Sequence, residues 1–517
     1  MATGADEEAL ARSLYLEVDY PGSIKAHERA LAAYREEGDA LSAARAARVL
    51  AWLHLNLYGD LTLAGGWLAR AERLLERADE DTVERGWAEV VHAILEPYGE
   101  IREARLAAAL EVGRRHRRAD LEFAALSRIA EDRIAAGRID EGMRLLDESL
   151  TAVCAGEIQD LEVVESVFCG MFVACEQLQD VARAEQWLRA ADEFVRRRNQ
   201  VAVGAFCRAH YGGILTAAGR WDEAEAELGQ AARMFEDGYE GSQAMVLARL
   251  ADLRVRQGRL EEAAVLLEGI DQRLDAARPV AALHLARGET ALARETIQRG
   301  LADSRTHPAA AGPLLALLVD VCVADDDVAG AAGAAERLAA HAESHRSPYL
   351  EACAALAQGK LCVASGSGDA KACLRDALSA FSRAQMPVEL ARARLELARA
   401  AAEEQPEVAV AEAKAALEAF DRRRARRDAD AAAALLRALG APGRSAPRRD
   451  PLTKRESEVL ELLGLGLSNP EIAERLVIST KTAEHHVGHI LSKLDLRNRA
   501  EAAAYATRAS GAKPGTE

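Results

Sequence analysis

Turn signals recur at nearly even intervals through the first 440 residues, and this recurrence limits the fold more than any other feature of the sequence. Each signal joins a glycine, glutamine or aspartate to a following charged residue, and most intervals are about 40 residues, with one near 30. The signals are Gly59-Asp60, Gly99-Glu100, Gly137-Arg138, Gln179-Asp180, Gly219-Arg220, Gly258-Arg259, Gly288-Glu289, Asp325-Asp326 and Gly368-Asp369. Such a period predicts a stack of helix pairs.

A small residue follows each turn at a fixed distance. Five positions after the start of each signal stand Ala64, Ala104, Gly142, Ala184, Ala224, Ala263, Ala293, Gly330 and Cys373. A small side chain there lets the second helix of a pair press against the first. Apolar residues recur at helical spacing almost throughout, and no stretch alternates as a strand would. We therefore predict an all-α repeat superhelix over residues 1–442, in which stacked pairs share one continuous core.

A different pattern begins after residue 450. Thr453 and Glu456 have the spacing of a capping box, which predicts a helix that ends at Gly464. Asn469 is expected to cap a short second helix from Pro470 to Leu476, because proline is favoured at the first helical position.

Two further helices complete this segment. Ser479 predicts the cap of a third helix over residues 480–494, and Asn498 with Glu501 predicts a fourth over residues 499–509. A short helix, a tight turn and a second helix form the helix-turn-helix plan.

The same segment resembles the DNA-binding domain of LuxR-type transcription regulators. The resemblance lies in Leu452-Thr453-Lys454-Arg455-Glu456, in Gly466-Leu467-Ser468-Asn469-Pro470-Glu471-Ile472-Ala473 and in His486-Val487. It implies double-stranded DNA as a partner, a homodimer on DNA through the fourth helix, and contact with RNA polymerase.

The third helix would enter the major groove with its N-terminal half against the bases. Its apolar residues Ala483, Val487, Ile490 and Leu491 would face the domain core. The resemblance places Glu484, His485 and Gly488 at base-reading positions. Glu484 could accept a hydrogen bond from cytosine, and His485 could donate one to guanine. Expected phosphate contacts are Thr453, Thr480, Lys481, His489, Lys493, Arg497 and Arg499.

Charge leaves a second interpretation open. The chain has a net charge of −17, whereas residues 451–508 carry eight basic and eight acidic side chains. A neutral domain has weak non-specific affinity for DNA. The alternative is an interaction scaffold whose helix-turn-helix docks a protein partner. The basic run Arg422 to Arg427 is read as a solvated face or a partner for acidic repeats, with an auxiliary DNA contact as its alternative.

The repeats resemble tetratricopeptide repeats, most clearly from His210-Tyr211-Gly212 to Ala231. Longer helices resemble the sensor part of large ATP-binding LuxR regulators, but no phosphate-binding loop motif occurs, so neither an ATPase domain nor a cofactor is expected. An unknown protein or small-molecule effector would bind the repeats. We expect a proline-containing linker over residues 443–450, the DNA-binding domain over 451–511 and a disordered tail over 512–517.

Other chemistry is sparse. The eight cysteines have no metal-type spacing and are predicted to be buried, reduced thiols. His341 with His345, and His485 with His489, have helical spacing but no third ligand. No catalytic motif, signal peptide or membrane-length apolar run occurs, so a cytoplasmic protein that is not an enzyme is expected.

Overall fold

The computed structural model of the protein consists of two compact units, Met1–Ala441 and Pro442–Glu517. The described residues are 2–17, 19–76, 81–198, 201–235, 240–303, 311–345, 347–441, 454–476, 478–493 and 498–510. Every regular element within these ranges is an α-helix, as predicted. The expected linker, residues 443–450, and the expected tail, residues 512–517, lie outside the described residues.

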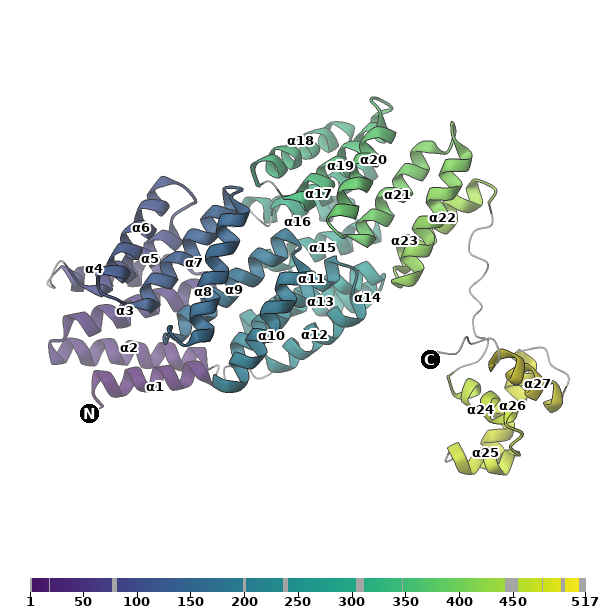
Figure 1. Cartoon of the computed structure of the whole chain (residues 1–517), viewed down its shortest axis with the longest axis horizontal. Coiled ribbons are helices and arrows are strands. Elements are labelled where there is room, and N and C mark those ends of the chain that lie inside the picture. The colour runs from purple at the N-terminus through teal and green to yellow at the C-terminus, as the bar shows by residue number, and fades with distance from the viewer. Residues whose placement is uncertain are drawn as a thin grey trace. The chain divides into compact units, whose positions relative to one another are not determined.

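The larger unit is an array of helix pairs that stack in chain order (Figure 1). Its helices are α1 Gly4–Leu16, α2 Tyr20–Glu37, α3 Ala40–Tyr58, α4 Leu61–Leu75, α5 Val83–Leu95, α6 Glu100–Arg115, α7 Ala119–Ala135, α8 Ile139–Ala155, α9 Leu161–Leu178, α10 Val181–Arg198, α11 Val201–Ala217, α12 Trp221–Met234, α13 Glu240–Gln257, α14 Leu260–Leu267, α15 Leu274–Arg287, α16 Thr290–Asp303, α17 Ala311–Ala324, α18 Val328–His345, α19 Pro348–Ser365, α20 Ala370–Arg383, α21 Pro387–Ala401, α22 Pro406–Arg422 and α23 Arg426–Ala438.

The odd-numbered helices form a continuous layer. From α3 to α23, each odd-numbered helix contacts the next odd-numbered helix as well as its own even-numbered partner. This arrangement is a repeat superhelix, because each pair contributes one helix to the shared layer and one to the outside.

The nine predicted turns are confirmed, and each separates the two helices of one pair, from α3–α4 to α19–α20. The first turn, Gly59-Asp60, shows why this residue pair ends one helix and begins the next. Gly59 has a φ of 64°, in the left-handed region that suits glycine. Asp60 then accepts a hydrogen bond from the Leu63 amide at 2.9 Å and caps α4.

The small residue after the turn is fully buried in six of the nine pairs, namely Ala64, Gly142, Ala184, Ala224, Ala263 and Ala293. The prediction is wrong at Ala104, which is exposed because α6 buries Arg102, Leu106 and Ala109 instead. Gly330 and Cys373 are only partly buried.

The capping of α18 explains why Gly330 is only partly buried. The third aspartate of this turn, Asp327, caps α18 and accepts the Gly330 amide at 2.8 Å. The helix therefore starts later, and Ala331 takes the inward place with none of its surface exposed. A Cβ on Gly330 would lie 2.2 Å from the Asp327 carboxylate, so Gly330 lies against the cap and not against the first helix of the pair.

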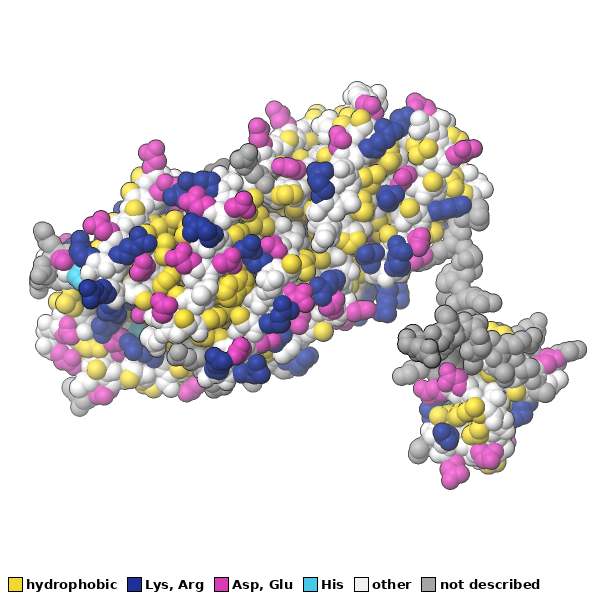
Figure 2. Space-filling view, viewed as in Figure 1, with side chains coloured by type: hydrophobic (Ala, Val, Ile, Leu, Met, Phe, Trp, Pro, Cys, Tyr) yellow, Lys and Arg dark blue, Asp and Glu magenta, His cyan; other side chains and the backbone are white. Residues whose placement is uncertain are grey.

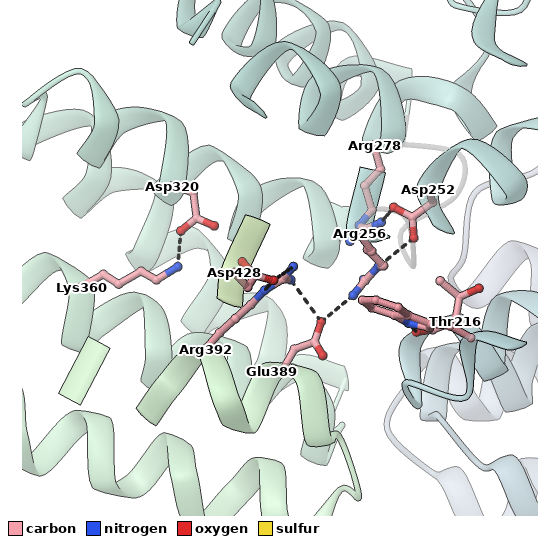
Figure 3. Close-up of polar contacts among 10 residues, drawn as sticks. Thr216, Asp252, Arg256, Arg278, Asp320, Lys360, Glu389, Arg392 and Asp428 are labelled. Atoms are coloured by element: carbon pink, nitrogen blue, oxygen red, sulfur yellow. Dashed lines mark hydrogen bonds and ion pairs between the residues drawn. The ribbon is translucent and has the colours of Figure 1, made fainter. Parts of the chain in front are cut away.

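The end of the array joins its middle. One hydrophobic cluster contains residues of α7, α9, α11 and α13 together with Val388, Leu395, Phe420 and Leu436 of α21 to α23. The Arg256 guanidinium of α13 donates to the Glu389 carboxylate of α21 at 2.8 Å (Figure 3). These two side chains are 6% and 9% exposed. The superhelix therefore closes on itself across 133 residues of sequence.

All eight cysteines are free thiols, but the prediction that all are buried is wrong. Cys154 is exposed and Cys169 and Cys373 are partly buried, while the other five are buried. Cys154 lies in the last turn of α8, where Ala152 and Val153 are the buried residues.

The smaller unit contains α24 Lys454–Gly464, α25 Asn469–Leu476, α26 Thr480–Lys493 and α27 Arg499–Ser510. The four predicted helices are confirmed, although Thr453 and Leu494 lie outside the described residues. The predicted cap of the second helix is wrong by one residue, because α25 begins at Asn469. Across the described residues of both units, no helix combines the length and apolar character that a bilayer crossing requires.

Candidate nucleic-acid interface

The smaller unit is organised around one apolar core. Val459, Leu463, Ile472, Ala483 and Ile490 are essentially inaccessible to solvent in this cluster, and Val487 is 8% exposed. The predicted inward face of α26 is thereby confirmed. Because α26 contributes one face to this core, its opposite face is left at the surface.

The turn before α25 is held by hydrogen bonds between Ser468 and the first turn of that helix. The Ser468 amide and hydroxyl donate to the Glu471 carboxylate at 2.7 and 2.6 Å, and the Ile472 amide donates to the Ser468 carbonyl at 2.9 Å. Ser468 is therefore the cap that Asn469 was expected to be. The bonds from Ser468 lower the pKa of Glu471, since they stabilise its ionised form.

Two arginines fix the ends of α25. Arg455 of α24 donates to the Leu476 carbonyl at 2.5 Å, at the C-terminus of α25. Arg499 of α27 donates to the Asn469 side chain at 2.6 Å and to the Leu467 carbonyl. Sequence reasoning did not identify the Arg455 contact, because its partner is a backbone carbonyl of another helix.

The three expected base-reading residues lie together on α26. Glu484, His485 and Gly488 are all exposed, and the structure leaves open space where a Cβ on Gly488 would stand. Helical spacing places them on one face, one turn apart. Their role in base recognition stays a prediction.

The expected phosphate contacts differ in their surroundings. Thr480 and Lys481 are exposed in the first turn of α26, where partly positive amide groups favour an anion. Arg499 is partly buried and donates inside the domain, so fewer of its N–H groups are available to a phosphate. Thr453 and Arg497 lie outside the described residues, as does the side chain of Lys493.

Of the two hydroxyls at this end of α26, Ser479 was predicted from the sequence as the helix cap, whereas Thr482 was not singled out. Ser479 accepts the Thr482 amide at 3.1 Å, which confirms it as the cap of α26, and the two hydroxyl oxygens lie 2.7 Å apart. Both residues are exposed. The signal was present in the run from Ser479 to Thr482, whose polar side chains surround the cap.

His489 lies beside an acidic group. Its Nδ1 is 3.8 Å from the carboxylate of Glu456, which is only 3% exposed, whereas the His489 side chain is 60% exposed. His485 and His489 stack edge to face with ring centroids 5.4 Å apart. Within the described ranges, no group of three or more His, Cys, Asp or Glu side chains has an arrangement suited to a metal ion.

Two solved helical structures align with most of this chain at low sequence identity. The Cut9 and Hcn1 hetero-tetramer of APC/C aligns with a TM-score of 0.41 and 12% identity, over 97% of this chain and 96% of that chain. The human IFIT1 dimer with m7Gppp-AAAA aligns with a TM-score of 0.38 and 14% identity, over 87% of this chain and 90% of that chain.

Similarity to curated proteins is confined to the C-terminal segment. The transcriptional regulatory protein LnrK of Bacillus subtilis is 54% identical over 57 residues, which are 11% of this chain and 26% of LnrK. The transcriptional regulatory protein LiaR of the same organism is 46% identical over 74 residues, which are 14% of this chain and 35% of LiaR. The chain thus spans about a quarter to a third of the length of these relatives.

The model of the bacterial regulatory proteins of the luxR family matches residues 450–506. This range contains α24, α25 and α26 and most of α27. The match and the four-helix geometry agree on the same segment, so the C-terminal unit carries the helix-turn-helix domain of the luxR family of bacterial regulatory proteins.

Proposed function

We propose that this protein is a transcription regulator that recognises specific sequences of double-stranded DNA through α26. In this proposal α26 lies in the major groove, Glu484, His485 and Gly488 meet base edges, and Thr480 and Lys481 contact phosphates. His489, Lys493, Arg497, Arg499 and Thr453 are proposed as further phosphate contacts at the margins of the interface.

One observation carries the proposal. The apolar side of α26 is buried in the domain core, while its polar side presents Glu484, His485 and Gly488 to solvent. A helix whose only task was packing would not need a glycine in the middle of its exposed face, because glycine weakens a helix. A glycine there leaves room for a close neighbour, and a base edge is such a neighbour.

The array is proposed to sense an effector protein or small molecule. The family domain is small, and the array supplies the greater part of the chain, with an inner layer of helices that many pairs share. We further propose a homodimer on DNA through α27, where Tyr505 is exposed, and contact with RNA polymerase. Control of the DNA-binding domain requires an effector with different affinities for two arrangements of the protein.

The test of DNA recognition is selection of binding sites from a random duplex pool with the full-length protein, followed by gel shifts at low salt. Enrichment of one sequence is the expected result. Glu484→Ala should lower affinity for that sequence more than for random DNA, by about 1–3 kcal/mol at one base position. Lys481→Ala should lower affinity for both and reduce the salt slope by about 1.

The same experiment separates this proposal from its rival, a helix-turn-helix that docks a protein. If the selected pool contains no enriched sequence and the protein's own promoter region is not retained, DNA recognition is refuted. Equal losses on selected and random DNA for Glu484→Ala would remove that residue from base reading.

A further inference from the structure

A cavity of about 150 Å³ lies where the end of the array meets its middle. One wall is the turn between α11 and α12 with the start of α12, and the other wall is the turn between α22 and α23. The lining residues are Gly219, Arg220, Trp221, Asp222, Glu223, Arg422, Arg423 and Arg424. In Figure 2 dark blue basic side chains gather at the edge of the array where α23 lies.

The charges in this cavity do not balance. Arg220 donates to Glu223 at 2.7 Å, and Arg424 lies 3.4 Å from Asp222. The expectation that the basic run is a partner for acidic repeats is therefore met at Arg424. Both carboxylates of the lining are thus engaged by arginines, which leaves a positive excess.

Arg423 carries that excess. Its guanidinium donates to the Ala419 carbonyl of its own helix at 3.3 Å, and no carboxylate of the described residues lies within ion-pair distance of it. The neighbouring Arg422 is held by Glu418 at 2.8 Å. Partial burial, together with the charge of Arg422, lowers the pKa of Arg423. A charge with this environment is stabilised by an anion.

The Arg423 side chain packs against the backbone of Gly219 on the opposite wall. Gly219 has a φ of 74°, and a Cβ at this position would lie 3.0 Å from the Arg423 Nε. The guanidinium therefore lies directly over a residue without a side chain. The next residues begin α12, whose N-terminus has no side-chain cap, so its first amide groups are free to face an anion.

We propose that this cavity binds the phosphate group of a small ligand. A planar guanidinium with several parallel donors matches the oxygens of a phosphate better than it matches a halide. The volume is several times the roughly 30 Å³ that one water molecule occupies in liquid, so a phosphate group fits.

A small ligand fits this site better than duplex DNA does. The basic residues line a cavity, and the chain around them carries the whole of the net charge of −17, because residues 451–508 balance. That surface repels an extended polyanion more than a compact one. A bound phosphate would bridge the two turns, which the Arg424 to Asp222 contact joins across 202 residues of sequence. The site does not depend on DNA recognition by α26.

The test is isothermal titration calorimetry of the full-length protein with pyrophosphate and with inorganic phosphate, at constant ionic strength set with chloride. Saturable binding at one site per chain, with a Kd of about 1 mM or tighter, is the expected result. Arg423→Gln should weaken it about tenfold or more. Arg424→Gln should weaken it less, since this side chain is 78% exposed and already has a carboxylate partner.

The matched control is Arg426→Gln, which removes a charge from the same run but does not line the cavity. It should leave the affinity unchanged. An unaltered melting temperature for Arg423→Gln excludes misfolding, and the exposed Arg424 serves if that variant is unstable. Absence of saturable binding by the unmodified protein would overturn the proposal. So would equal weakening by Arg426→Gln, or a loss of affinity for random duplex DNA in Arg423→Gln without any phosphate binding.

Discussion

Two charged groups, a buried ion pair in the array and an exposed glutamate in the helix-turn-helix domain, lie in opposite environments. In the array, Arg256 and Glu389 are almost fully buried and bind each other, and Asp252 joins Arg256 at 3.0 Å. In the domain, Glu484 is exposed on α26, and no partner within the described residues of the domain holds it. The buried pair has its partners within the fold, so its role is to stabilise the array. The exposed Glu484 has no such role in its domain, so it is the better residue to test for DNA recognition.

The largest effect is expected from replacing one residue of the buried Arg256–Glu389 pair. Arg256→Met or Glu389→Leu alone should lower the free energy of unfolding of the array by about 3 kcal/mol, the lower end of the range for breaking a buried pair, because Asp252 still neutralises Arg256 and Arg392 still neutralises Glu389. All five tryptophans of the chain lie in the array, at positions 52, 67, 87, 187 and 221. Urea unfolding followed by tryptophan fluorescence therefore reports on the array.

The control for this prediction is the double variant. Arg256→Met with Glu389→Leu removes both charges and should recover most of the lost stability, as apolar replacements of buried ion pairs often do. If the double variant is as unstable as the sum of the two single variants, the pair is not the coupling between α13 and α21.

A second prediction uses a buried carboxylate of the array. Glu165 of α9 is 9% exposed and accepts a hydrogen bond from the Tyr15 hydroxyl of α1. Burial raises the pKa of Glu165 to about 7, although the Tyr15 hydrogen bond opposes the rise. The folded array therefore keeps the Glu165 proton at a pH where the unfolded chain, with an ordinary glutamate pKa of about 4.3, has lost it.

The direction in which stability changes with pH follows from the number of protons that the folded and unfolded states bind. Between about pH 4.5 and pH 7 the folded state holds one more proton than the unfolded state, so stability falls as the pH rises and then levels off. Glu165→Gln keeps an acceptor for Tyr15 and removes the ionisation. It should raise the free energy of unfolding near pH 8 by up to about 3 kcal/mol and change it little near pH 4.5. An equal effect at both pH values would contradict the raised pKa.

The features that could be predicted from the sequence are those that depend on residues close together in the chain. The nine turns were found because a turn-forming residue and a charged residue are neighbours in the chain, and at Gly59 and Asp60 these are a left-handed glycine and a helix cap. The exposed face of α26 followed from helical periodicity in the same way. The register after the Asp325 turn was missed because it depends on which of three aspartates caps α18.

Contacts between distant segments could not be predicted. Arg256 and Glu389 stand 133 residues apart, and either would look equally solvated on a helical wheel. Arg499 was expected at a phosphate, yet its bond to the Leu467 carbonyl depends on how α27 lies against the turn after α24. Helical periodicity assigns a side chain to a face, but only the packed structure identifies its partner.

A third prediction tests the small core of the domain. A Cβ on Gly464 of α24 would lie 2.8 Å from the Cβ of Ala506 on α27, so the two helices touch at this glycine. Gly464→Ala should destabilise the domain by about 1–2 kcal/mol, because the clash outweighs the gain in helix propensity. Hydrogen exchange of the α24 amides in the full-length protein measures this. Unchanged or slower exchange would mean that α24 and α27 do not approach this closely.

The smallest expected effect comes from Gly488→Ala, which should change the stability of α26 and its affinity for DNA in opposite directions. Gly488 of α26 is exposed, and a Cβ there would meet no other atom within 4 Å. Gly488→Ala should therefore stabilise α26 by about 0.5–1 kcal/mol, because alanine loses less conformational entropy in a helix. If Gly488 lies against a base edge, the same methyl group should weaken binding to the selected DNA sequence while random DNA is bound as before. Slower hydrogen exchange together with weaker specific binding is the expected pair of results. Slower exchange with unchanged DNA affinity would place Gly488 outside the interface, and base reading would then rest on Glu484 and His485 alone.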